Sequence, residues 1–401
     1  MSRICLVTHV VVPWDGQGRV NYELARHLVG HGHEVTLVAS EVEPGLARHR
    51  LVRWLRVPVP RRLPEPLKWL CFALQVRLRL GPRQLARFDI VHLHGAIAPI
   101  QADVNTSHYV HTGMQREGPR QLDPWQRAVT AVCAWTERRA YRSARRVVAV
   151  SDGVAGTLRR TGVSARGRLR VIYNGVDPDE FRPRLPTDSR PLRDGLDLPA
   201  SAFLLLFVGD AVSARKNLDL ALLTLARLDP RFRLVVIGEH RSGPYREIAD
   251  QLGVGERTYF LGPRRDVAEC LRDADALLCL SHYEPASLVL LEGLASGIPV
   301  IASPAVGNAR FIDHGVNGFR LRGTDDVDRL TWLVETLERD PGLALRVGAS
   351  ARSTAVQLTW TRMARQYEAL YRELLAELAR ARFTDFALEG PSGLSSAGGR
   401  A

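Results

Sequence analysis

FLLLFVG (203–209) begins a second series of apolar strands, after a first series that opens with ICLVTHVVV (4–12). Continuous apolar runs of this length are typical of strands buried on both faces of a parallel sheet. Helical stretches and further strands follow each of them, among these EVTLVAS (34–40) and RLVVIGE (233–239). The alternation, started twice, predicts an α/β protein with two doubly wound domains. Such domains bind ligands at the carboxyl ends of their strands.

The segment 177–200 is rich in Pro and Asp and has little periodicity, so we place the domain boundary within it. The expected N-terminal domain covers residues 1–185 and the C-terminal domain residues 186–360. A strong helical pattern predicts a C-terminal helix over 361–384 that returns toward the N-terminal domain. Residues 385–401 have the composition of a disordered tail.

The composition of the 401 residues, 45% hydrophobic and 24% charged, is that of a globular protein with a sizeable core. No apolar run approaches the roughly 18 residues that span a bilayer. The opening MSRICLVTHVVVP lacks the cleavage site of an export signal, and we expect it to stay in the mature chain. The five cysteines lie scattered in apolar runs, which favours reduced core residues of a cytoplasmic protein.

The formal net charge of +12 is unevenly distributed, because residues 1–200 carry +13 and residues 201–401 carry −1. Within residues 48–87, basic side chains alternate with Trp54, Trp69 and Phe72. This pattern predicts peripheral docking on an anionic membrane, at the inner face for a cytoplasmic protein. The alternative is an Arg-rich solvated face with its tryptophans packed in the core. The sequence contains no zinc pattern or helix-turn-helix, so we expect no nucleic-acid partner.

The stretch SHYEPASLVLLEGLASGIPVIAS (281–303) carries two carboxylates eight residues apart. We expect Glu284 to lie in a loop after a strand, and Pro285 to open a helix that contains Glu292. The two carboxylates would then face one cleft and accept hydrogen bonds from sugar hydroxyl groups, while the helix N-terminus attracts a phosphate. The alternative is that Glu284 stabilises the helix dipole and Glu292 is a solvated helix residue.

Two loops that follow strands are candidates for binding phosphate. In GDAVSARKN (209–217), Arg215 and Lys216 stand between a strand and a helix, where cations would clamp a diphosphate. In PWDGQG (13–18), Gly16 would let the backbone approach a diphosphate from the other domain. The alternatives are an exposed basic pair in the first case and a plain tight turn in the second.

Together these segments resemble the family 4 retaining glycosyltransferases, which have the GT-B fold of two Rossmann-like domains facing a cleft. The family pattern of two Glu residues and a following G-x-P-V strand is matched by Glu284, Glu292, Gly297, Pro299 and Val300. The version EPASLVLLE is most similar to bacterial lipopolysaccharide-core glucosyltransferases, although Pro-Ala replaces the common Phe-Gly. IYNGVDPDEF (172–181) and DHGVNGFRL (313–321) resemble further family segments in the same order.

The resemblance implies roles for the candidate residues. Glu284 would contact hydroxyl groups of the donor sugar and Glu292 the ribose of the nucleotide. Arg215 and Lys216 would neutralise the diphosphate, and Asn217 stands where the family loop usually has Gly. The implied catalytic residues are Glu284, Lys216, Arg215 and His111. The implied nucleotide-sugar-binding residues are Gly16, Arg215, Lys216, Glu284, Ser287, Leu288 and Glu292.

Several family members have a His in the first domain that contacts the donor or acceptor sugar. His111 is our preferred match and His108 the second, while Asp103 is a candidate for orienting the acceptor. A structural hydrogen-bonding role is the alternative for each of these three residues. His92 and His94, near a strand end, are expected to be structural.

The implied function is transfer of a sugar from a nucleotide-diphosphate sugar, UDP- or GDP-linked, to an acceptor hydroxyl with retention of configuration. The setting would be the synthesis of a bacterial glycan, glycolipid or glycosylated metabolite, with a small-molecule or lipid-linked acceptor bound by the first domain. We expect no cofactor and no metal, because Arg215 and Lys216 would take the charge-neutralising role that a metal fills elsewhere. The metal-like triplet Asp273-Ala-Asp275 falls at a helix end beside a strand and is expected to be structural. The alternatives are a nucleotide-sugar epimerase of similar paired-domain fold and an inactive binding protein.

Overall fold

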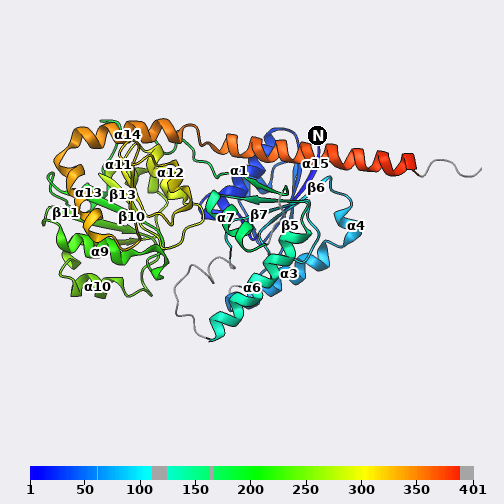
Figure 1. Ribbon diagram of the computed structural model, residues 1–401, viewed down its shortest axis with the longest axis horizontal. Helices are drawn as coiled ribbons and strands as arrows, with labels where there is room; N and C mark the ends of the chain where they lie inside the picture. The colour runs from blue at the N-terminus through cyan, green and yellow to red at the C-terminus, as the bar shows by residue number, and fades with distance from the viewer. Residues whose placement is uncertain (61, 111–123, 163–166, 389–401) are drawn as a thin grey trace, which may run out of the picture.

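The computed structural model has two α/β domains side by side, and α15 (Trp360–Leu388) crosses from the second domain back over the first (Figure 1). The structure describes residues 1–60, 62–110, 124–162 and 167–388. All five cysteines are unpaired. In the part of the chain that the structure describes, no helix combines the length and the apolar character needed to cross a bilayer.

The first domain is built on a seven-stranded parallel sheet with the order β5-β3-β1-β6-β7-β8-β9. Its strands are β1 (Arg3–Val7), β3 (Glu34–Ala39), β5 (Val52–Arg56), β6 (Ile90–His94), β7 (Val104–Ser107), β8 (Arg146–Ala149) and β9 (Leu169–Val171). Its helices are α1 (Gly16–Gly30), α2 (Pro44–Ala47), α3 (Glu65–Arg79), α4 (Pro82–Leu85), α6 (Pro124–Ser143) and α7 (Asp152–Arg160), and β2 (Val10–Val11) pairs with β4 (Glu41–Val42).

The second domain repeats this plan on a six-stranded parallel sheet with the order β12-β11-β10-β13-β14-β15. Its strands are β10 (Phe203–Val208), β11 (Phe232–Ile237), β12 (Thr258–Gly262), β13 (Ala276–Cys279), β14 (Val300–Ala302) and β15 (Phe319–Arg320). Its helices are α8 (Pro191–Gly195), α9 (Leu218–Arg227), α10 (Tyr245–Gln251), α11 (Val267–Asp273), α12 (Leu288–Ala295), α13 (Val327–Arg339) and α14 (Pro341–Ala355), with short 3₁₀ turns η1 (Ala214–Lys216), η2 (Gly255–Arg257) and η3 (Gly307–Phe311).

The apolar strands predicted from the sequence are buried on both faces because successive side chains point to opposite sides of a sheet. In β10, Leu205 and Phe207 join a core with α9 and α13, whereas Leu204 and Leu206 join another with α11 and α12. Fully burying one such side chain contributes about 1.5–3 kcal/mol. Strand order reverses between β1 and β6 and between β10 and β13, so each sheet has a crevice at that point.

The chain returns to the first domain after α14. Val176 pairs with Thr359, and a Cβ added to Gly175 would lie 2.3 Å from the backbone nitrogen of Trp360. Along α15, Met363, Tyr367 and other apolar side chains are buried in the core that α1 covers. The helix runs to Leu388 and so takes in the first four residues of the expected tail, while 389–401 lie outside the described residues.

Candidate active site

The loop after β10 holds its two cations in a fixed turn. The Asp210 carboxylate accepts hydrogen bonds from the Val212 amide (2.8 Å) and the Ser213 hydroxyl (2.9 Å). Asn217 has a left-handed backbone with φ of 59°, which Asn tolerates better than most residues. Its side-chain amide donates to the carbonyls of Leu280 (3.1 Å) and Thr324 (2.6 Å). Asn217 therefore supplies the conformation of a Gly and also ties the loop to its neighbours.

Arg215 and Lys216 meet Glu284 at the carboxyl end of the second sheet. Lys216 Nζ donates to Glu284 Oε2, and Arg215 Nη1 donates to the same oxygen at 3.1 Å. The backbone amide of His282 also donates to the Arg215 carbonyl (2.9 Å), which fixes the two loops together. Glu284 and Lys216 have only 14% and 16% of their side chains exposed. The three predicted residues thus form one charged cluster beside the β10–β13 switch point.

The helix after Glu284 begins later than the sequence suggested. α12 starts at Leu288, and the Ser287 hydroxyl caps it by accepting from the Leu290 amide (3.2 Å). Pro285 stays in the loop, where its carbonyl accepts a hydrogen bond from the Ser151 hydroxyl of the first domain (2.5 Å). The prediction that Pro285 opens the helix is therefore wrong, because Ser287 provides a side-chain cap that Pro285 lacks.

Glu292 lies in the second turn of α12 and faces residues of the domain junction. Burial raises the pKa of Glu292 to about 7, while Arg19 opposes this rise and Glu180 adds to it. Arg19 reaches across from α1 and donates to Glu180 at 2.8 Å. Near neutral pH this carboxyl group is therefore partly protonated and able both to donate and to accept hydrogen bonds.

Gly16 is the first residue of α1, whose N-cap is Asp15. The Asp15 carboxylate accepts from the Gly18 amide (2.6 Å), and a Cβ at Gly18 would lie 3.0 Å from that oxygen. A Cβ at Gly16 would meet nothing within 4 Å. Local packing therefore requires a small residue at Gly18, while Gly16 remains exposed and open on the side of the helix N-terminus.

Burial lowers the pKa of His92, His94 and His108, which are gathered near the ends of β6 and β7. His111, the preferred candidate, lies outside the described residues. His108 Nε2 lies 3.1 Å from His94 Nδ1, and burial lowers the pKa of His108 to about 4. The other ring nitrogen of His94 is buried without a hydrogen-bond partner among the described residues. His94 therefore retains an unused polar atom, which the sequence did not reveal.

Three other polar residues hold the fold together. Asp103 precedes β7, at the amino end of the strand, where it accepts from the Val91 amide (2.9 Å); this position opposes a role in orienting the acceptor. Asp273 accepts from the Leu192 and Arg193 amides at 2.9 Å each, and Asp275 accepts from Arg193 Nη2 at 2.6 Å. The D-x-D triplet thus joins α8 to the sheet.

A cavity of about 520 Å³ lies at the carboxyl-end crevice of the first domain, between α3 and α6. Among its described lining residues Glu137 is the one acid, and none is Lys or Arg. The ring of Tyr109, also in this lining, lies 5.4 Å from the ring of Tyr283, the neighbour of Glu284. The lining is mainly apolar and includes His9, Trp69, Leu70, Ala73, His94, Ile97, His108, Tyr109, Val129, Val132, Cys133 and Glu137.

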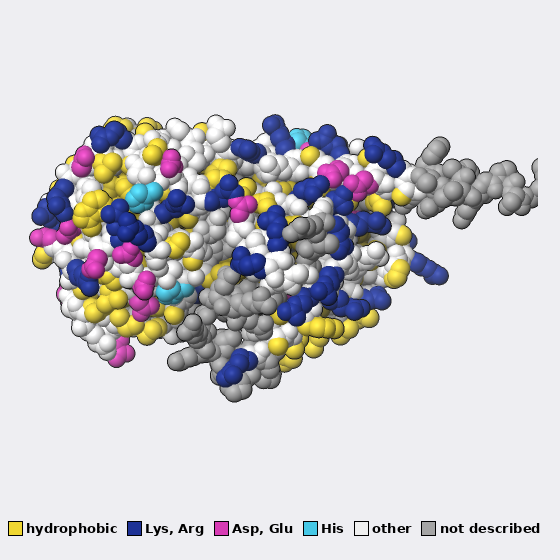
Figure 2. Space-filling model, viewed as in Figure 1, with side chains coloured by type: hydrophobic (Ala, Val, Ile, Leu, Met, Phe, Trp, Pro, Cys, Tyr) yellow, Lys and Arg dark blue, Asp and Glu magenta, His cyan; other side chains and the backbone are white. Residues whose placement is uncertain are grey.

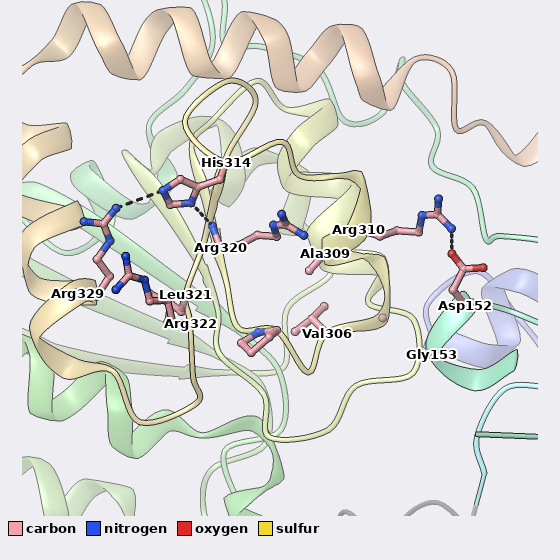
Figure 3. Close-up of a pocket in the computed structure, with 12 residues that line it drawn as sticks. Asp152, Gly153, Val306, Ala309, Arg310, His314, Arg320, Leu321, Arg322 and Arg329 are labelled. Atoms are coloured by element: carbon pink, nitrogen blue, oxygen red, sulfur yellow. Dashed lines mark hydrogen bonds and ion pairs between the residues drawn. The ribbon is translucent and has the colours of Figure 1, made fainter. Parts of the chain in front are cut away.

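A second cavity of similar size opens beside η3 and the end of β15 (Figure 3). Figure 3 shows Arg310 pointing to Asp152 of α7, with which it forms an ion pair, and His314 between Arg320 and Arg329. Within the described chain, Arg320 and Arg329 form no ion pair with an acid. No residue of the predicted donor site lines this cavity. Its arginines are spread along the sequence, and Arg320 alone among them lies in a quoted family segment, DHGVNGFRL (313–321).

Comparison with known proteins places the chain in a family. The family model "Glycosyltransferase Family 4" matches residues 14–180, and "Glycosyl transferases group 1" matches residues 188–354. A D-inositol 3-phosphate glycosyltransferase of Xylanimonas cellulosilytica is 30% identical over 84% of this chain and 87% of its own length. A protein of the same description from Frankia alni is 30% identical over 89% of this chain and 94% of its own length. The chain therefore belongs to the family 4 glycosyltransferases and is a glycosyltransferase.

Solved structures share the architecture of both domains. A sucrose-phosphate synthase from Thermosynechococcus elongatus superposes with a TM-score of 0.79 at 21% identity, covering 94% of this chain and all of that one. WaaG, a glycosyltransferase involved in lipopolysaccharide biosynthesis, superposes with a TM-score of 0.77 at 20% identity, covering 92% of this chain and 99% of that one. The expected GT-B fold is confirmed, and the epimerase alternative gains no support from these relatives.

Proposed function

We propose that the second domain binds a nucleotide-diphosphate sugar and that the first domain presents the acceptor hydroxyl to it. The observation that carries this proposal is the contact of Arg215 and Lys216 with Glu284 beside the switch point of the second sheet. Fixed cations at that place stabilise the negative charge that develops on a departing diphosphate. A crystal structure of Anabaena HepE in complex with UDP and glucose, with a TM-score of 0.71, has the same fold.

In the proposed reaction, the bond from the sugar C1 to the diphosphate breaks and its electron pair stays on the phosphate oxygen. The acceptor hydroxyl forms the new bond on the same face and passes its proton to the released diphosphate, so configuration is retained. Glu284 would exchange part of its contact with the cations for sugar hydroxyl groups, and Ser287 and Leu288 would present the start of α12 to the phosphates. Glu292 would bind the ribose, and Gly16 would approach the diphosphate from α1.

A donor screen tests the site before the acceptor is known. Uridine, guanosine, adenosine and thymidine diphosphate sugars are compared by thermal shift, and a UDP- or GDP-linked sugar should raise Tm most. Glu284→Gln should weaken this shift, whereas Glu335→Gln, which alters an exposed helix pair, should not. The shift should also survive EDTA, since Arg215 and Lys216 take the place of a metal. An unchanged shift in Glu284→Gln would contradict the assignment.

We infer that the acceptor has an apolar body, because the first-domain cavity offers mainly apolar side chains and no Lys or Arg among the residues described. The relatives named D-inositol 3-phosphate glycosyltransferase indicate a phosphorylated polyol, and such a ligand needs cations that the described part of this lining does not contain. His94, whose Nε2 has no hydrogen-bond partner among the described residues, would hold the acceptor hydroxyl near Tyr109. n-Decanol should therefore bind to the full chain in calorimetry more tightly than inositol 3-phosphate. Tighter binding of the phosphate would overturn the inference.

We also propose that the cavity's rim rests on a membrane, at the inner face of a bacterial cell. Leu70, Leu74 and Leu78 of α3 are 57–74% exposed, and Trp135 of α6 is 62% exposed. Figure 2 shows hydrophobic side chains beside Lys and Arg along the lower edge of this domain. Phe72, by contrast, is fully buried in the core. Of the residues 48–87 expected to contact a membrane, the proposed docking surface therefore includes only the exposed side of α3.

Vesicle flotation tests this docking surface. The wild-type chain should float with vesicles that contain phosphatidylglycerol and remain behind with phosphatidylcholine alone. Leu74→Glu together with Leu78→Glu should abolish flotation, because a carboxylate disfavours both the apolar layer and the anionic surface. Leu345→Glu, at a residue that is 76% exposed on α14, is the matched control and should float normally. Equal flotation with both lipids would contradict the proposal.

A further inference from the structure

Three histidines surround one carboxylate where α15 packs on the C-terminal end of α1. This cluster lies beside the amino ends of the strands, away from the crevice at their carboxyl ends. Glu368 Oε2 lies 3.3 Å from His27 Nε2 and 3.0 Å from His31 Nδ1. Glu368 Oε1 lies 3.5 Å from His33 Nε2. The ligand atoms of His27, His31 and Glu368 all lie within 4.8 Å of one another, a grouping found once among the described residues.

We propose that His27, His31 and Glu368 form a Zn²⁺ site that joins the C-terminal helix to the first domain. Around tetrahedral zinc, with bonds of about 2.0–2.1 Å, neighbouring ligand atoms are roughly 3.4 Å apart. The separations of 3.3 and 3.0 Å from Glu368 to the two rings are close to that value. His27 and His31 are four residues apart on α1 and so project from one face of the helix. Three protein ligands leave a fourth position for water.

The surroundings of the cluster fit a metal site. The side chains of His27 and Glu368 are 10% and 18% exposed, whereas His31 is 44% exposed and leaves a path for the ion to enter. His33 contacts the carboxylate oxygen that the other two rings leave unused, so it would position Glu368. Two imidazoles and one carboxylate favour Zn²⁺ over Mg²⁺ or Ca²⁺.

The site would matter for the arrangement of the chain rather than for transfer. α15 begins where the chain crosses from the second domain and then runs over the first (Figure 1), and Glu368 lies two turns into this helix. A metal bound there would link α15 to α1 through bonds that the apolar packing of the two helices does not supply. Zinc should therefore raise the unfolding temperature of the chain, and a chelator should reverse that rise.

Calorimetric titration of the tag-free full chain with zinc sulfate, after removal of metals with EDTA, tests the proposal. One Zn²⁺ per chain and a higher Tm are expected. His31→Gln should weaken binding at least about 10-fold, and His33→Gln about 10-fold through the orientation of Glu368. His49→Gln, an exposed histidine outside the cluster, is the matched control and should bind as the wild type does.

A spectroscopic readout separates loss of metal binding from loss of fold. Co²⁺ in place of zinc should give the visible absorption of a low-coordinate nitrogen and oxygen site, and Glu368→Gln should abolish it while circular dichroism stays native. The proposal would be overturned by the absence of zinc binding to the wild type, or by equal affinity in the His31→Gln chain. Transfer activity does not enter the test, so its outcome is independent of the proposed function.

Discussion

The two sheets arrange their first six strands in the same order, yet their carboxyl-end crevices carry opposite chemistry. In the second domain, Arg215, Lys216 and Glu284 meet in a cluster of full charges. In the first, a cavity lined by apolar side chains and the neutral His94 and His108 occupies the equivalent place. The doubly wound sheet therefore decides where a ligand binds, and the residues at the strand ends decide which ligand.

Lys216→Ala should have the largest effect on activity, because it removes a fixed cation from the charged crevice of the second domain and leaves the first-domain cavity unchanged. We expect kcat to fall by about 10²–10³ while the protein unfolds as the wild type does. The rate of nucleoside diphosphate release measures kcat, and circular dichroism follows unfolding. Arg227→Ala, which breaks an exposed ion pair with Asp328, is the control and should keep full activity. Near-native turnover in Lys216→Ala would show that the charged crevice is not the donor site.

Asn217→Ala should be the next largest change. The substitution replaces Asn, which tolerates the left-handed region, with Ala, which rarely adopts it, and removes two hydrogen bonds to carbonyls, at a cost of about 2 kcal/mol. Asn217→Gly keeps the backbone conformation and should cost about 1 kcal/mol. Urea unfolding of both variants measures the difference. An Asn217→Ala chain as stable as Asn217→Gly would show that the strained turn does not hold this loop.

The two crevices should respond to pH in opposite directions. Burial raises the pKa of Glu292 above its ordinary 4.5 to about 7, so the folded chain binds an extra proton between these values. The contribution of Glu292 to stability therefore falls as pH rises from about 4.5 to 7. Burial lowers the pKa of His108 from 6.5 to about 4, so its contribution falls as pH drops below 6.5.

Unfolding free energies at pH 5 and pH 8 test this contrast. Relative to the wild type, Glu292→Gln should gain stability at pH 8, and His108→Gln should gain stability at pH 5, each by roughly 1 kcal/mol. Chemical denaturation at both pH values measures the differences. If both variants changed stability in the same direction with pH, the electrostatic contrast between the domains would be wrong.

Arg310→Ala should have the smallest effect. Arg310 and Asp152 join the two domains, but their side chains are 52% and 46% exposed, and exposed ion pairs contribute less than about 1 kcal/mol. We expect a change in unfolding free energy within that limit and little change in turnover. A loss of several kcal/mol in urea unfolding would show that this contact, rather than the apolar packing of α15, joins the domains.

Patterns of residues close together in the sequence were sufficient to predict the strands and much of the charged crevice. Apolar runs predicted the strands, and the Glu-x7-Glu segment predicted the charged crevice. The start of α12 was misplaced because Pro285 and Ser287 are both acceptable near a helix N-terminus, and their side-chain contacts decide between them. The cluster at Glu368 was invisible because its partner His31 lies 337 residues away. The apolar cavity likewise forms only when α3 and α6 pack together.

The most direct test of the central claim uses pyrophosphate, which carries the charge of a nucleotide donor without its base or sugar. Calorimetry compares the wild type with Lys216→Ala and with Arg320→Ala, which changes a separate Arg-containing cavity (Figure 3). We predict that Lys216→Ala weakens pyrophosphate binding at least about 10-fold and that Arg320→Ala leaves it unchanged. Undiminished binding in Lys216→Ala, with loss in Arg320→Ala, would contradict the account.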